Sequence, residues 1–423
     1  MQAQSHGTLE DSFIQDVAET MTSRSNDVKS EELSSNQDYS PSPLDEVEEH
    51  GELSQQSQWI LKSTGQNVKT IVDYYVSKHT ELSADIACHY IVDLTVQRHP
   101  KSIRNEFSEE EWSEMLGMQN ESPLRLPTAC EEMITKFKAC NFLTQIDKLD
   151  NDFLEGSFSS IEQRRSSDGS HLRYIEFVHK KFFDCWKHDP NRLRNQSQGT
   201  FVSRLISSVV EELFVNDVKI VSPNWGELGS VESSIQRIGQ QTDIIFNMSD
   251  ANKTECGFCE VSGPMDQEDA TKVRDDREKL AKEMKDALDL VLKRASSAPL
   301  ERLRKLKIWG IQIEGWTWRL YSISLCYDGL YRFEQLNYCA VPKHPDEWVL
   351  ISTFCRHLIH FREIILATCK QIEDVIQVSN FTTPPNSPSV TSRIIREAIM
   401  TPRKPKGNQR NRDILRKPRR LQF

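Results

Sequence analysis

The sequence predicts an α+β fold, in which a mixed sheet is flanked by helices, follows a helical region and lies between disordered tails. Two short apolar runs, 242–246 and 255–263, are joined by a polar, turn-rich segment, which is typical of a β-hairpin. Residues 269–295 then carry apolar side chains at helical spacing. Strand-like runs at 308–313 and 316–323, and another that begins at 330, follow this helix.

The two ends of the chain have opposite charge, although the formal net charge is −10. Through residue 52 there are thirteen acidic residues against Arg24 and Lys29. From residue 393 onward there are eleven Lys or Arg against two acidic residues. Segments this polar cannot bury enough apolar surface to offset their ordering entropy. We therefore expect a disordered acidic segment over 1–53 and a disordered basic tail over 378–423.

Between the tails we expect a helical region over 54–155 and an α/β core over 170–377. Apolar side chains recur at helical spacing in 59–76, 82–94 and 133–143. Ser108 and Glu111 match a capping box at a helix start. Residues 156–169 are expected to form an exposed loop, 200–215 an amphipathic helix, and 222–241 a polar connection. A long final helix begins near Pro345.

The hairpin carries the residues of greatest chemical interest. Strand alternation would place Cys256, Phe258, Glu260 and Ser262 on one face. The carboxylates of Asp243 and Glu260 are then expected within about 7 Å of each other at one end of the sheet, close enough to share a divalent metal.

The helix after the hairpin should begin close to these acids. Gly263 and Pro264 end the second strand, Asp266 is a candidate N-cap, and Asp269 would lie in the first turn. The same order of strands, acids and helix also occurs in many purely structural αβ cores.

This succession of short motifs resembles the PD-(D/E)XK, or restriction-endonuclease-like, core, and more closely a set of fungal proteins that have that core. The resemblance covers about residues 199–370. Its matching segments, in order, are 199–201, 225–227, 242–246, 260–263, 285–289, 310–312 and 328–332.

The resemblance implies a Mg²⁺-dependent phosphodiesterase site. Asp243 and Glu260 match the two acids that hold the metal beside a phosphate. The family's lysine follows the second acid by two residues, and Ser262 stands in its place. A hydroxyl carries no charge, so the positive charge of the family's lysine would have to come from Lys272 or Lys279 on the next helix. Without such a lysine the core would be inactive or would bind metal weakly.

Glu212, near the end of the 200–215 helix, is a further candidate metal ligand. The alternative for Glu211 and Glu212 is an exposed pair that faces water.

The cysteines and histidines favour structural roles. A zinc site requires four ligands, and Cys256 and Cys259 have no second close pair nearby. Redox Cys-x-x-Cys pairs begin helices, whereas this pair lies in an expected strand. His357 and His360 have no third ligand in view. The ten scattered cysteines indicate reduced thiols in a reducing compartment.

The basic tail predicts binding to nucleic acid and import into the nucleus, with a cytoplasmic location as the alternative. Two dense clusters carry this prediction: Arg403, Lys404 and Lys406, and Arg416, Lys417, Arg419 and Arg420. No apolar run reaches the roughly 18 residues of a membrane span, so no membrane partner is expected. The leading functional hypothesis is a nucleic-acid-associated protein with a nuclease-like core. The alternative is a non-enzymatic scaffold built on the same core.

Overall fold

The computed structural model describes residues 58–381, apart from 80–84, 97, 99–101, 118–124, 167, 195, 226–241 and 263–268, together with residue 395. The acidic segment over 1–53 and the basic clusters at 403–406 and 416–420 lie outside the described residues.

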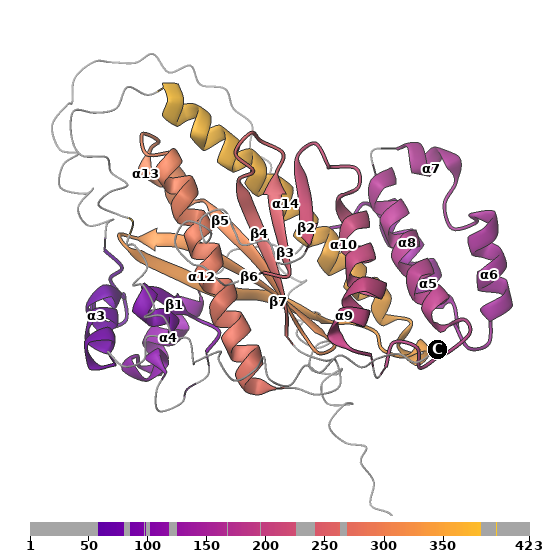
Figure 1. The fold of residues 1–423 in the computed structure, drawn as a ribbon, viewed down its shortest axis with the longest axis horizontal. Coiled ribbons are helices and arrows are strands. Elements are labelled where there is room, and N and C mark those ends of the chain that lie inside the picture. The colour runs from indigo at the N-terminus through magenta and orange to yellow at the C-terminus, as the bar shows by residue number, and fades with distance from the viewer. Residues whose placement is uncertain are drawn as a thin grey trace, which may run out of the picture. The chain divides into compact units, whose positions relative to one another are not determined.

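A seven-stranded mixed sheet organises the described chain, with the strand order β1-β7-β6-β5-β4-β3-β2. The strands are β1 (Ile91–Asp93), β2 (Val221–Trp225), β3 (Ile244–Met248), β4 (Glu255–Ser262), β5 (Lys307–Glu314), β6 (Thr317–Tyr327) and β7 (Leu330–Ala340). The β1/β7 and β4/β5 pairs are parallel, and the other pairs are antiparallel. The predicted α+β class with a mixed sheet and flanking helices is confirmed, as is the β3–β4 hairpin (Figure 1).

Two long helices, α12 (Ala270–Arg294) and α14 (Leu350–Phe381), pack on opposite faces of the sheet. Glycines in the central strands allow this close approach. A Cβ on Gly310 would lie 2.5 Å from Sδ of Met284 in α12, and one on Gly257 would lie 2.8 Å from Cδ1 of Ile365 in α14. Since real Cβ contacts are longer than this, neither position has room for a side chain.

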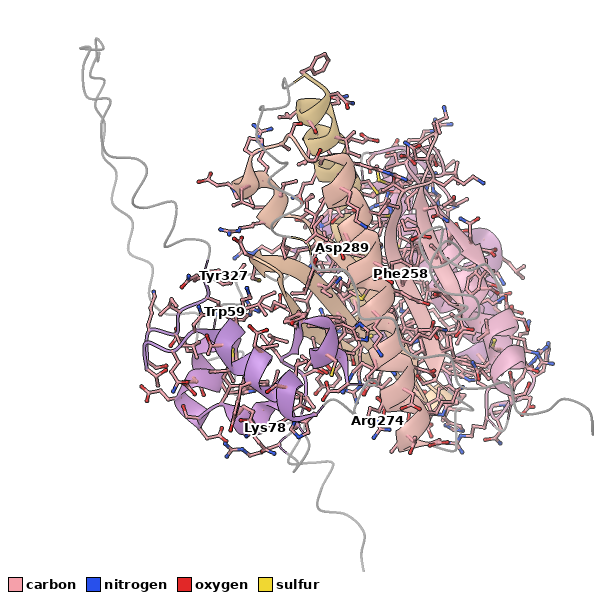
Figure 2. All side chains as sticks on the ribbon, turned by 60° about the vertical axis from the view of Figure 1, so that its left-hand side comes forward. Trp59, Lys78, Phe258, Arg274, Asp289 and Tyr327 are labelled. Atoms are coloured by element: carbon pink, nitrogen blue, oxygen red, sulfur yellow. The ribbon has the colours of Figure 1, made fainter. Side chains whose placement is uncertain are left out.

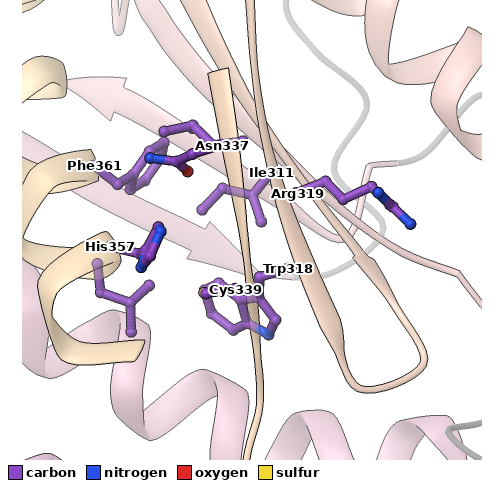
Figure 3. A pocket seen from close by; sticks show the side chains of 9 residues that line it. Ile311, Trp318, Arg319, Asn337, Cys339, His357 and Phe361 are labelled. Carbon is purple, nitrogen blue, oxygen red and sulfur yellow. The ribbon is translucent and has the colours of Figure 1, made fainter. Parts of the chain in front are cut away.

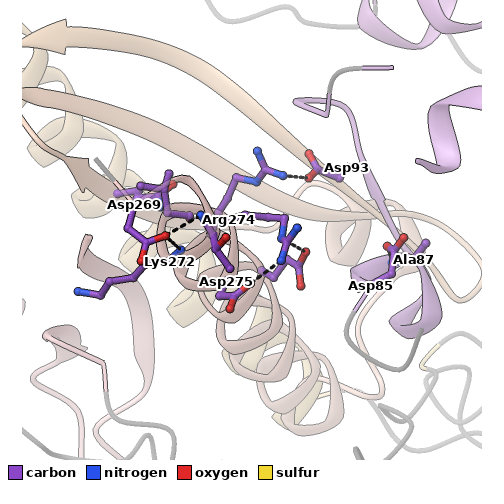
Figure 4. A network of polar contacts seen from close by, with 12 residues as sticks. Asp85, Ala87, Asp93, Asp269, Lys272, Arg274 and Asp275 are labelled. Atoms are coloured by element: carbon purple, nitrogen blue, oxygen red, sulfur yellow. Dashed lines mark hydrogen bonds and ion pairs between the residues drawn. The ribbon is translucent and has the colours of Figure 1, made fainter. Parts of the chain in front are cut away.

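The start of α12 is fixed by a side-chain cap. The carboxylate of Asp269 accepts hydrogen bonds from the backbone N–H groups of Thr271 and Lys272 (Figure 4). The helix predicted over 269–295 is confirmed, but the expectation that Asp266 caps it is wrong. Asp269 is the N-cap because Ala270 is the first helical residue.

The region before residue 118 forms a small unit at the β1 edge of the sheet. It contains α3 (Val68–Lys78), η1 (Ile86–His89), η2 (Ile103–Glu106) and α4 (Glu109–Leu116). Its separate apolar cluster includes Trp59, whose ring stacks 5.4 Å from Tyr327 of β6 (Figure 2). The Ser108–Glu111 capping box is confirmed.

The helical interpretation of 82–94 is wrong, because η1 is a short 3₁₀ turn and residues 91–93 form strand β1. Short apolar runs do not distinguish a helix from a buried strand. Here pairing with β7 decides the conformation.

A second group of helices covers the β2 side of the sheet and shares its core. It comprises α5 (Thr128–Ala139), α6 (Ile146–Glu155), α7 (Ile161–Arg165), α8 (Gly169–Trp186), α9 (Gln198–Phe201), the π-helical η3 (Val202–Ile206) and α10 (Ser207–Phe214). The predicted 200–215 helix therefore exists as three joined pieces. The loop expected over 156–169 instead contains α7, with Phe158 buried against Phe137.

The polar connection expected from residue 222 is also wrong in its first part, because residues 221–225 pair with β3. Pro223 lacks a backbone donor and sits within this strand. Proline is tolerated here because β2 is the last strand in the sheet order.

The predicted side-chain alternation of β4 breaks at its start. The register shifts between Phe246 and Asn247, so the residues opposite them are Gly257 and Glu255. Cys256 is the extra residue of this bulge. Its thiol interacts with Cys369 of α14, so Cys256 does not share a face with Glu260 as expected.

The chain remains ordered slightly beyond residue 378, where the basic tail was expected to begin. Helix α14 continues to Phe381, and Ser379 is buried and accepts a hydrogen bond from the N–H of Ser297 at 3.1 Å. Ile395 is half-buried and packs against the main apolar core. None of the described helices is long and apolar enough to cross a membrane.

Candidate functional site

The site lies where β3 begins and β4 ends, and these two points lie at the same end of the sheet because the strands are antiparallel. Asp243 directly precedes β3, and its Oδ2 accepts a hydrogen bond of 2.7 Å from the N–H of Val261. Glu260 projects from β4 and its side chain is only 4% exposed. Both predicted acids therefore lie at this end of the sheet, Asp243 just before β3 and Glu260 on the neighbouring strand β4.

Helix α12 presents a row of charged residues to the acids. Lys272, Asp276, Lys279 and Glu283 follow a 4-3-4 spacing, which places them on one helix face. Nζ of Lys279 lies 2.7 Å from Oε1 of Glu260. Of the two lysines proposed to replace the one missing at position 262, Lys279 is the one beside the second acid.

The charged row contains two acids that the sequence reasoning missed, Asp276 and Glu283. The hydroxyl of Thr242, next to Asp243, donates a hydrogen bond to the carboxylate of Glu283. The sequence does indicate both acids, because their 4-3-4 spacing places them on the same helix face as the two candidate lysines.

The environment of the site shifts its titrations. Burial raises the pKa of Glu260 well above its usual range, and the nearby carboxylates of Glu283 and Asp243 add to this, while Lys279 opposes it. Burial alone would lower the pKa of Lys279, but Glu260, Glu283 and Asp243 outweigh burial and the pKa is raised. The ammonium is therefore stabilised in its charged form.

Ser262 takes part in a buried hydrogen-bond network. Its Oγ accepts from Nε2 of Gln312 on β5 at 2.9 Å, and its side chain is also hydrogen-bonded to Asp276. The same Gln312 nitrogen donates to the carbonyl of Val273 in α12 at 2.7 Å. Ser262 thus links β4, β5 and α12 at the point where the resemblance places a lysine.

Lys272 faces a different partner from Lys279. Its Nζ donates to Oε1 of Gln198 at 3.2 Å, and Nε2 of Gln198 donates to the carbonyl of Val261 at 2.7 Å. Lys272 lies in the first turn of α12, beside the Asp269 cap (Figure 4). Lys272 therefore ties the start of α12 to α9, and Gln198 ties α9 to the end of β4. Lys272 is not paired with Glu260.

The structure does not bring Glu212 to the acids. Its carboxylate is near Tyr174 and Arg173 of α8, and burial there raises its pKa. Within the described chain, no interaction joins Glu212 to Asp243 or Glu260. The prediction that Glu212 helps to hold the metal is therefore unsupported, because α10 turns this residue toward α8.

The residues present at the site fit a hard divalent cation in charge and donor type. In formal charge, four carboxylates (Asp243, Glu260, Asp276 and Glu283) exceed two ammonium groups (Lys272 and Lys279) by two. Glu260 and Glu283 are buried, and the other four residues are half-buried. Oδ2 of Asp276 is buried and accepts no hydrogen bond from any described residue.

Such an excess of charge is costly in a partly buried site unless a proton or a cation balances it, and the raised pKa values of Glu260 and Asp276 reflect this cost. No three His, Cys, Asp or Glu side chains of the described residues form a ready-made metal cage. Mg²⁺ does not require one, since it usually binds through one or two carboxylates and retains several waters.

A small cavity on the other face of the sheet is unrelated to this site. It is lined mainly by β6, β7 and α14 and includes His357 and Phe361 (Figure 3). Its volume of about 20 Å³ has room for roughly one water molecule. Nδ1 of His357 lies 2.8 Å from the Thr353 carbonyl, within its own helix, as expected of a helix-face histidine.

The cysteines of the Cys-x-x-Cys pair are both buried free thiols. Interaction with Cys369 and burial raise the pKa of Cys256, and burial raises the pKa of Cys259. A neutral buried thiol is a poor nucleophile and metal ligand, in keeping with a structural role.

Comparison of the chain with models of protein families, with curated proteins and with solved structures finds no match in any of the three.

Proposed function

We propose that this protein is a Mg²⁺-dependent phosphodiesterase that acts on nucleic acid, with Asp243, Glu260 and Lys279 as its central residues. The 2.7 Å approach of Lys279 to Glu260 is the observation that carries the proposal. Lys279 would supply, from α12, the positive charge that Ser262 lacks. The order of first acid, second acid, helix and further strands also supports the resemblance to PD-(D/E)XK proteins.

Each residue has a distinct role in this proposal. Asp243 and Glu260 would hold Mg²⁺, which when bound supplies Lewis-acid stabilisation of a phosphoryl oxygen. Lys279 would stabilise negative charge that develops on the phosphate and would orient the attacking water. Gln198 would fix the end of β4 through the Val261 carbonyl, and Lys272 would hold the Gln198 side chain in place.

A second candidate function is a non-enzymatic scaffold. The observation in its favour is the same Lys279–Glu260 ion pair, in which Lys279 can serve only as the counter-ion of a buried carboxylate. In that case Lys279 would stabilise the fold, and the site would bind no metal.

A metal-dependent cleavage assay separates the two functions. Full-length protein is incubated with double-stranded DNA, single-stranded DNA and RNA in Mg²⁺ or Mn²⁺. We expect Asp243→Ala and Lys279→Met each to lower the rate by roughly 10²–10³-fold. Asp275→Ala is the matched control, because Asp275 lies on the exposed face of the same helix. If the wild-type protein is folded and cleaves none of these substrates, the scaffold function stands.

A further inference from the structure

The stretch from the end of α8 to η3 carries four cations without acidic partners. One is on α8, and the other three are the arginines of residues 187–204, a segment with a single acid, Asp189. Lys181, Arg192, Arg194 and Arg204 are together called the basic face. The three arginines are exposed and Lys181 is half-buried. Among the residues that the structure describes, no carboxylate pairs with any of the four.

Neighbouring lysines behave differently. Lys180, one residue away, is 2.7 Å from Asp184, and Lys187 is paired with Asp150. Lys181 instead donates to the hydroxyl of Ser208 at 3.0 Å, which ties α8 to α10. The unpaired cations are thus a local feature of one face.

The basic face converges from three parts of the chain. Lys181 is on α8, Arg192 is in the turn that follows it, and Arg204 is on η3. All three lie near the buried Cys185, where burial raises the thiol pKa and these cations oppose the rise. A surface with several fixed positive charges close together attracts a partner with closely spaced negative charges.

The basic face is connected along the chain to the candidate site through Gln198. This residue lies between Arg194 and Arg204 in sequence and contacts both the Val261 carbonyl and Lys272. In Figure 1, α9 lies at the end of the sheet where the N-terminal half of α12 also lies. A chain of phosphates bound to the basic face would therefore reach toward Asp243, Glu260 and Lys279.

We propose that the basic face binds the phosphodiester backbone of a nucleic-acid strand and guides it to the acid site. This inference rests on the proposed function, because the connection to that site is what favours nucleic acid over other polyanions. Arginine suits this role, since its planar guanidinium can donate two parallel hydrogen bonds to one phosphate. The basic face lies within the folded core and is separate from the basic tail.

The test measures binding of full-length protein to labelled single-stranded DNA, duplex DNA and RNA over a range of salt concentrations, without divalent metal. The variant is Arg192→Glu/Arg204→Glu. We expect affinity to fall at least tenfold and the slope of log K against log salt to decrease by about two, since each phosphate contact contributes roughly one. Circular dichroism checks that the double variant is folded. If the charge reversal perturbs folding, Arg192→Gln/Arg204→Gln removes the same two charges without reversing them and should lower the affinity and the salt slope in the same direction.

Lys180→Glu is the matched control, because Lys180 is on the same helix but is already paired with Asp184. Equal losses in the control and the double variant would overturn the proposal, as would unchanged affinity and slope in the double variant. Stronger wild-type binding to polyglutamate or to phosphatidylserine vesicles than to nucleic acid would also overturn it. If the double variant loses binding but neither wild type nor any variant cleaves nucleic acid, the proposed binding face is supported and the proposed phosphodiesterase activity is contradicted.

Discussion

At the scale of single residues, Glu260 links the chemistry of the site to stability. Its raised pKa means that the folded state holds this proton more tightly than the unfolded chain does. The contribution of Glu260 to the free energy of unfolding is therefore present at low pH and is lost as pH rises from about 4.5 through the folded pKa.

Glu260→Gln removes this titration while keeping the shape of the side chain. In metal-free protein near pH 8 we expect the variant to be more stable than wild type by about 1 kcal/mol, with the difference vanishing near pH 4. Urea unfolding over a pH series measures this. Mg²⁺ should stabilise wild type but not the variant.

Glu301→Gln is the control, because Glu301 is an exposed residue of α13 (Leu300–Arg304). The same urea series on this variant should match wild type. If the variant were less stable than wild type near pH 8, the ionised Glu260 paired with Lys279 would stabilise the fold, which contradicts the prediction.

Ser262→Lys tests which residue supplies the positive charge. If the acids lacked a lysine, this substitution would raise cleavage. Because Lys279 already lies beside Glu260, and Ser262 is buried and bonded to Gln312, we expect cleavage to stay level or fall. Initial rates, with Ser262→Ala for comparison, measure this. A rise of tenfold or more would show that Lys279 does not serve the site.

At the scale of elements, the packing of α8 on α5 and α14 depends on a neutral histidine. The ring of His179 stacks 3.8 Å from that of Phe137, and its Nδ1 is bonded to the Ile175 carbonyl at 2.7 Å. Burial lowers the pKa of His179 to about 3. Its stabilising contribution is therefore present above the unfolded pKa of about 6.5 and is lost as pH falls toward 3.

His179→Phe should make this helix group less sensitive to acid. Between about pH 6.5 and 3, we expect the free energy of unfolding to decline less steeply than in wild type, by up to roughly 1.4 kcal/mol per pH unit. Thermal or urea unfolding over this range measures the slope. The exposed His188→Gln serves as the control, and an identical decline in all three proteins would contradict the assignment.

At the scale of the whole molecule, the basic tail and the basic face should contribute separately to nucleic-acid binding. Truncation after Phe381, the end of α14, removes both basic clusters and also Ile395, but none of the described helices and strands. We expect a weaker affinity, a smaller salt slope and, if the clusters carry the import signal, a shift to the cytoplasm. Binding titrations and imaging of a tagged protein measure these.

The truncated protein should still lose affinity when Arg192→Glu/Arg204→Glu is added, because that face belongs to the folded core. An unchanged salt slope and unchanged location after truncation would show that the tail has neither role.

The sequence by itself determined the features that depend on local periodicity. The hairpin at 242–262, the α12 and α14 helices, and the Ser108 capping box all follow from side-chain spacing and turn residues. The two acids and the suspicion about Lys279 also came from this level, because alternation along a strand and spacing along a helix limit where side chains project.

Only the tertiary structure decided the rest, because those features depend on residues far apart in the chain. Pairing with β7 and β3, rather than local propensity, makes β1 and β2 strands. The bulge places the side chain of Cys256 on the opposite face from the one that strand alternation predicts, and sequence spacing does not reveal such a shift of register. The pairing of Glu260 with Lys279 rather than Lys272, and the position of Asp276 and Glu283 beside the acids, depend on the packing of α12 against β4. Burial of that row then set the pKa values, since desolvation is a property of the assembled fold.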